Sequence, residues 1–353
     1  MQKLLVGICG NWKYLLDNLE LDGALLQEFA IIEDDSIKNY ATEVTVRKNN
    51  MNIQIRKIVF TTLLFFVVSC SEESIQNVEF SDSRALTLVN NSAESFSSAW
   101  AIKDSDAMGE LYSEDAIRIV STLHTPVYGR EAIASEFTKD FGEEFAMTTI
   151  EPLANVARFL SPNIVFGTGT FDIKDANGST IMQGLWGNAY ELQGDKLVML
   201  MESAGASSTN GMNPSSLAIP QIKDQTYSGP GSDLINDAVV AYEMNTNSVN
   251  PKGVADLFTG NGIMTISANG RAIVGNDNIL ESITSSAAPG ITLDAWAYGY
   301  RELNESYALG WGGYEQTDSS GSIIEYGQWG NIWEITTDGL KLVIERAGAF
   351  SGE

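Results

Sequence analysis

The sequence predicts an α+β fold built twice in tandem, in which a bent antiparallel sheet wraps about three N-terminal helices in each domain. Three observations lead to this prediction. A repeat recurs at a spacing near 145 residues. Within each repeat, helix-like periodicity comes first and strand-like alternation follows. The strand-like segments are separated by turn sequences such as Asn177-Gly178, a strong hairpin signal.

The repeat is clearest at the end of each domain. Aligning residues 186–206 with residues 329–349 gives 10 identities in 21 positions without a gap. Upstream the register shifts by three residues, so that Leu111 matches Leu257. We therefore expect domains at 82–206 and 231–353. Residues 207–230 form a linker rich in Ser, Asn, Gly and Pro, unless residues 217–219 pin part of it to a domain face.

The elements of the first domain follow from local patterns. Residues 84–102 carry an apolar stripe with helical spacing, and a short helix is expected over 106–112. A strand over 115–121 precedes a third helix that opens after Gly129, with Glu131 in its first turn and Ile133 on its apolar face. Four strand-like segments complete the domain, at 148–159, 163–173, 180–192 and 196–205.

Residues 51–69 have the pattern of a signal peptide. Arg56 and Lys57 precede the apolar residues 58–69, and Cys70 follows. This run is too short to span a bilayer, which takes about 20 helical residues. Residues 1–50 are then a spurious or cleaved N-terminal extension, and 70–81 a flexible tether. The alternatives are a buried strand at 58–68 with Cys70 as a core thiol, and a cytoplasmic arm at 1–50.

Composition excludes several classes of function. Residues 70–353 contain 14 Lys or Arg and 38 Asp or Glu, a formal charge of −24 that disfavours nucleic acids and anionic lipid surfaces. Cys70 is their only cysteine and His124 their only histidine, so we expect no disulfide, no metal site and no cofactor. Any membrane attachment is expected through lipid on Cys70 alone.

Two family resemblances refine these expectations. Residues 67–70 resemble the bacterial lipobox, which implies acylation of Cys70, and the flank Ser71-Glu72-Glu73 implies lipid anchoring in the outer membrane, facing the periplasm or the surface. The segments 127–133 and 186–188, with their counterparts 273–279 and 329–334, resemble the SnoaL-like branch of the nuclear-transport-factor-2-like superfamily. The SnoaL-like resemblance implies a cone-shaped pocket between the sheet and the helices. It also implies pairing of domains through their sheets, so that the two domains would form an internal pseudo-dimer.

Alternation along two strands suggests residues for this pocket. One face carries Trp186, Asn188 and Tyr190, and the matching strand of the second domain carries Trp329, Asn331 and Trp333. An amide among aromatic rings is suited to an apolar ligand with one polar group. The alternative is that these aromatic residues belong to the core or to an interface between sheets.

Acid–base chemistry needs a buried titratable group. The candidates are Glu202, Glu345 and Asp294, with a rim glutamate or a structural ion pair as the alternative for the two glutamates. We expect a binding protein for a small apolar or weakly polar ligand, or for an envelope protein partner, rather than an enzyme. An isomerase or cyclase of this fold and a structural assembly lipoprotein remain the alternatives.

Overall fold

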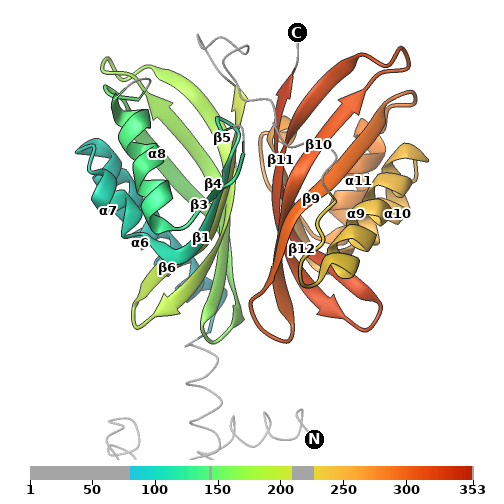
Figure 1. Cartoon of the computed structure of the whole chain (residues 1–353), viewed down its shortest axis with the longest axis horizontal. Helices are drawn as coiled ribbons and strands as arrows, with labels where there is room; N and C mark the ends of the chain where they lie inside the picture. The colour runs from blue at the N-terminus through green and yellow to red at the C-terminus, as the bar shows by residue number, and fades with distance from the viewer. Residues whose placement is uncertain (1–79, 124, 143–144, 209–225, 352–353) are drawn as a thin grey trace, which may run out of the picture. The chain divides into compact units, whose positions relative to one another are not determined.

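The computed structural model describes residues 80–123, 125–142, 145–208 and 226–351, all within one compact unit, Phe80–Glu353. The predicted extension, signal peptide and acylated Cys70 lie outside the described residues, as do His124 and most of the linker. The described residues form two six-stranded sheets, each with helices on one face (Figure 1). This confirms the predicted α+β fold with two domains.

The first domain begins with its helices. Ser81 caps the first helix by accepting a hydrogen bond from the Arg84 amide, and Asp104 caps the second through the Ala107 amide. In chain order the elements are α6 (Asp82–Ala101), α7 (Ser105–Gly109), β1 (Tyr112–Val120), β2 (Val127–Tyr128), α8 (Arg130–Gly142), β3 (Thr149–Ser161), β4 (Ile164–Lys174), β5 (Thr180–Gln193) and β6 (Lys196–Ser208). The prediction from sequence missed the two-residue β2 and extended the second helix to residue 112, whereas α7 ends at Gly109 and Tyr112 begins β1.

The second domain repeats this order. Its elements are α9 (Ser232–Asn247), α10 (Pro251–Ala255), β7 (Phe258–Ile266), the 3₁₀-helix η2 (Ser267–Asn269), β8 (Ile273–Val274), α11 (Asn276–Ser286), β9 (Thr292–Glu302), β10 (Tyr307–Thr317), β11 (Ile323–Thr336) and β12 (Gly339–Ser351). None of the helices in the described ranges has the length and apolar character needed to cross a bilayer.

Both sheets have the same strand order, β2-β1-β6-β5-β4-β3 and β8-β7-β12-β11-β10-β9. Neighbouring strands are antiparallel except β1 with β6 and β7 with β12, which are parallel. In the parallel pairs Arg118 lies opposite Glu202, and Met264 lies opposite Glu345. The last strand of each domain therefore places its glutamate, Glu202 or Glu345, beside the first strand. This position matters for the candidate site.

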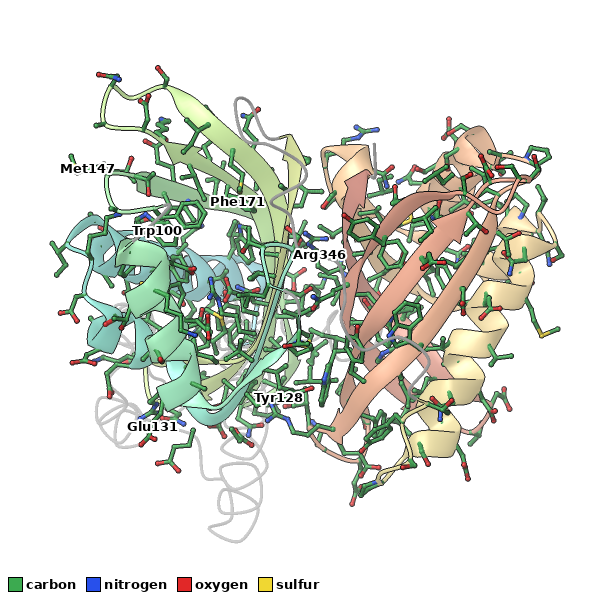
Figure 2. The ribbon with its side chains drawn as sticks, turned by 45° about the horizontal axis from the view of Figure 1, so that its top comes forward. Trp100, Tyr128, Glu131, Met147, Phe171 and Arg346 are labelled. Atoms are coloured by element: carbon green, nitrogen blue, oxygen red, sulfur yellow. The ribbon has the colours of Figure 1, made fainter. Side chains whose placement is uncertain are left out.

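The two sheets pack against each other through the faces that their own helices leave uncovered (Figure 1). Aliphatic residues of both sheets form this layer, among them Ile119, Ala189, Ile332 and Ile344. Arg346 lies between the sheets (Figure 2), fully buried, and its Nε donates to the Leu185 carbonyl of the first domain over 3.1 Å. Burial lowers the pKa of this guanidinium to about 9.

Glycine allows a close approach between the sheets. A Cβ on Gly205 of β6 would lie 2.7 Å from the Gly348 Cα of β12, which is backbone and has no side chain to rotate away. We expect Gly205→Ala to destabilise the protein by about 1–3 kcal/mol, because the sheets must separate. Urea denaturation measures the free energy of unfolding of the wild type and the variant. Gly142→Ala is the control, since a Cβ there meets nothing within 4 Å; equal stability of the two variants would contradict the prediction.

Candidate functional site

Each domain encloses a cavity between its helices and its sheet. The cavity of the first domain has a volume of about 90 Å³ and that of the second about 340 Å³. Pockets that hold small molecules span about 300–1,000 Å³. Only the second cavity reaches that range, so the two domains differ in their capacity for a ligand despite sharing one topology.

The residues singled out by strand alternation line these cavities. Trp186, Asn188, Tyr190 and Glu202 line the first cavity. Trp329, Asn331, Trp333 and Glu345 line the second. The opposite face of the same strands, with Ala189 and Ile332, forms the contact between the sheets. The four aromatic side chains therefore belong to the cavity walls and to the cores of their own domains, away from the sheet interface.

The two asparagines have a structural task in addition to their place in the walls. The Oδ1 atom of Asn188 accepts a hydrogen bond from the Ser203 amide over 3.2 Å, and that of Asn331 accepts from the Arg346 amide over 2.9 Å. The Asn188 amide nitrogen also donates to the Tyr190 hydroxyl. In the second domain Trp333 replaces that tyrosine and offers no hydroxyl. The amide oxygens are thus engaged in holding the last strand.

Glu202 belongs to a closed hydrogen-bond network. Its Oε2 atom accepts from the Tyr112 hydroxyl over 2.6 Å and from Arg118 Nε over 3.0 Å. Burial opposes the charge on Arg118, but the neighbouring Glu202 raises the pKa of the guanidinium above its ordinary value. Burial and the Glu202 charge likewise raise the pKa of the Tyr112 hydroxyl. This is the structural ion pair that we weighed as the alternative to a catalytic role.

Glu345 occupies the equivalent place without that network. Met264 stands opposite Glu345 where Arg118 stands opposite Glu202, and Phe258 stands where the first domain has Tyr112. Glu345 is 6% exposed, and its Oε2 atom has no hydrogen-bond partner among the described residues. Burial raises the pKa of its carboxyl to about 7, against a hydrogen bond from Tyr242 that lowers it. The second cavity therefore contains a buried carboxyl that titrates near neutral pH.

The larger volume of the second cavity follows from smaller side chains. The first domain packs Trp100, Phe137 and Phe141 in edge and stacked contacts, and Trp100 lines its cavity. At the repeat-related positions the second domain has Thr246, Ile283 and Ala287, all of which line its cavity. The exchange of aromatic rings for small side chains leaves the space empty.

Asp294 does not line either cavity. It is exposed on β9, while its neighbours Leu293 and Ala295 line the second cavity, because side chains alternate between the two faces of a strand.

The structure adds residues that alternation did not suggest. Tyr314 on β10 donates a hydrogen bond to Glu325 on β11 over 3.1 Å, and both line the second cavity with Tyr242. The replacement of Arg118 by Met264 was visible in the repeat alignment and signals the asymmetry.

No family model matches this sequence, and no curated protein matches it at a significant level. Solved structures with similarity include a ketosteroid isomerase-like protein from Erwinia carotovora, at 16% identity and a TM-score of 0.30 over 35% of this chain and 100% of that chain. A domain with a cystatin-like fold from Nostoc punctiforme has 13% identity and a TM-score of 0.32, and the match covers 46% of this chain and 99% of that chain. An NTF-2 like protein of unknown function from Shewanella oneidensis has 18% identity and a TM-score of 0.29, and the match covers 33% of this chain and 94% of that chain. These values support no conclusion on activity.

Proposed function

We propose that this protein is a lipoprotein of the cell envelope that binds a small, largely apolar ligand in the cavity of its second domain. One observation carries the proposal. A cavity of about 340 Å³ with a mainly hydrophobic wall is lined by Glu345, whose buried carboxyl has one oxygen without a partner among the described residues. Buried polar atoms are almost always hydrogen-bonded, so this oxygen is suited to a ligand group.

The first domain has a supporting part in this proposal. Its cavity is small, and its carboxyl is already paired with Arg118 and Tyr112. Its sheet holds the second sheet through the aliphatic layer and the buried Arg346. The sequence pattern of residues 56–70 supports the proposed lipid anchor on Cys70, and with it the proposed location in the envelope.

Native mass spectrometry of residues 71–353, produced in the protein's own host and compared with the denatured mass, tests this function. That segment contains the whole compact unit Phe80–Glu353. We expect a retained small mass in the wild type and its loss in Thr246→Trp, which restores the aromatic side chain of the first domain inside the cavity. Thr337→Trp, at an exposed turn, is the control. A bare monomer or a defined oligomer from the wild type would favour an assembly role instead.

A second candidate function is acid–base catalysis by Glu345. It is favoured by the place of Glu345 in the wall of a cavity that has room for a substrate, where burial raises the pKa of its carboxyl to about 7 and suits it to proton exchange near neutral pH. Incubation of the identified ligand in deuterated buffer tests it. Catalysis predicts deuterium uptake at carbon with the wild type and at least tenfold slower uptake with Glu345→Gln. Equal rates would remove Glu345 from any such mechanism.

A further inference from the structure

The charges around the second cavity all have the same sign. Two carboxyl groups line it, Glu325 and Glu345, and none of the described lining residues is a lysine, arginine or histidine. The guanidinium that neutralises the equivalent carboxyl in the first domain is replaced by Met264. A positive charge is therefore missing from the wall of a cavity that has room for one.

Each carboxyl has only a hydroxyl donor. Tyr314 donates to Glu325 Oε1, and Tyr242 donates to Glu345, whose Oε2 atom stays without a partner among the described residues. A hydrogen bond from a tyrosine relieves part of the cost of burying a carboxylate but does not neutralise it. Glu345 is more than nine-tenths buried and is one of the residues that line the cavity, and its Oε2 atom is the carboxyl oxygen left without a partner.

The remaining wall is aromatic and aliphatic. Trp329 and Trp333 line it from β11, and aliphatic side chains of α9, α10 and α11 line it from the helices, among them Val239, Val254 and Ile283. Aromatic faces attract organic cations, and aliphatic side chains bury an apolar body. A hydrated metal ion gains nothing from such walls, whereas an amine with an apolar body fits both the walls and the carboxyl.

We infer that the ligand of the second cavity is an organic ammonium, an amine with an apolar body whose cationic nitrogen pairs with Glu345. The inference rests on the proposed function, because it names the class of ligand for the same cavity. It also explains the difference between the domains. In the first domain Arg118 already supplies the cation, and the small cavity has no place for another. Charge repulsion from Glu325 and Glu345 disfavours carboxylates and phosphates in the second cavity.

This pairing makes binding depend on pH. The groups around Glu345 are Tyr242 from α9, Tyr314 from β10 and Glu325 from β11, while Met264 from β7 carries no charge. Arg346, the next residue of β12, is directed to the sheet interface. Glu345 ionises as the pH rises through about 7, and an alkylamine stays protonated up to about pH 10. Affinity for an amine therefore rises between pH 6 and pH 8.

Calorimetric titration of residues 71–353 with 4-phenylbutylamine, 4-phenylbutanol and 4-phenylbutyrate tests the inference. These probes share one body and differ in the terminal group. At pH 8 we expect the amine to bind about tenfold more tightly than the alcohol, which corresponds to about 1.4 kcal/mol, and the acid to show no binding. Between pH 8 and pH 6 the affinity for the amine falls about tenfold and that for the alcohol stays within twofold.

Variants locate the effect. Glu345→Gln should reduce the preference for the amine to within twofold while the alcohol binds as before, and Met264→Arg should abolish amine binding by supplying an internal cation. Glu305→Gln, an exposed change of equal charge, is the control. Alcohol binding without a preference for the amine overturns the inference and leaves the proposed function standing. Absence of binding by all three probes counts against both, and a preference that survives in Glu345→Gln places the cation elsewhere.

Discussion

Arg118→Leu is expected to reduce the free energy of unfolding by about 3–5 kcal/mol at pH 7.5, the largest effect we predict for any single substitution. The reason is the charge left behind. Glu202 is 6% exposed and loses its ion pair with Arg118 Nε, keeping only the hydroxyl of Tyr112. Urea denaturation of residues 71–353, followed by circular dichroism, gives the free energy.

The control for this prediction comes from the second domain. Met264→Leu changes the equivalent position, opposite Glu345, without removing a charge, and should cost less than about 1.5 kcal/mol. Adding Glu202→Gln to Arg118→Leu should recover most of the loss, since the stranded charge is gone. A loss below about 1 kcal/mol in the single variant would show that water or another group compensates Glu202.

Glu345→Gln is expected to stabilise the protein at pH 8 by about 3 kcal/mol. The folded protein holds the Glu345 pKa at about 7, above the ordinary value of 4.5, so folding favours the protonated carboxyl. The stability that the protonated Glu345 carboxyl contributes to the folded protein is complete below about pH 4.5, and it is lost as the pH rises through about 7. Glutamine resembles the protonated form at every pH.

The measurement is the difference in unfolding free energy between the wild type and Glu345→Gln, followed from pH 4.5 to pH 8. The difference should grow with pH and level off above about 7.5, and Glu305→Gln should show no such trend because it is exposed. A constant difference across this range would mean that Glu345 is ionised throughout and would contradict the prediction.

Most of the fold was predictable because its signals are local. Turn sequences such as Asn177-Gly178 and apolar alternation between them depend on a few neighbouring residues, and they placed the four long strands of the first domain correctly. The two-residue β2 (Val127–Tyr128) was missed because alternation cannot be read over two positions. The parallel pairing of β1 with β6 was also missed, since it joins segments about 85 residues apart.

The candidate site was predictable in part for the same reason. Alternation showed that Trp329, Asn331 and Trp333 share a face, but nothing local shows whether that face meets the helices or the other sheet. The loss of the ion pair in the second domain depends on Arg118 meeting Glu202 across the sheet, a contact over 84 residues that appears only in three dimensions. Asp294 was a candidate as a titratable residue, although alternation along β9 directs it away from the cavity that its neighbours Leu293 and Ala295 line.

The parallel pairing of the first strand with the last has a consequence for the order of folding. Neither sheet can close until its final strand has emerged, because Tyr112 pairs with Met199 and Phe258 with Leu342. Contacts at such sequence separation carry a large entropic cost of loop closure and slow the folding of a domain. The first domain is complete at Ser208, before any element of the second begins, so we expect it to form first and the second sheet, with Arg346, to dock on it last.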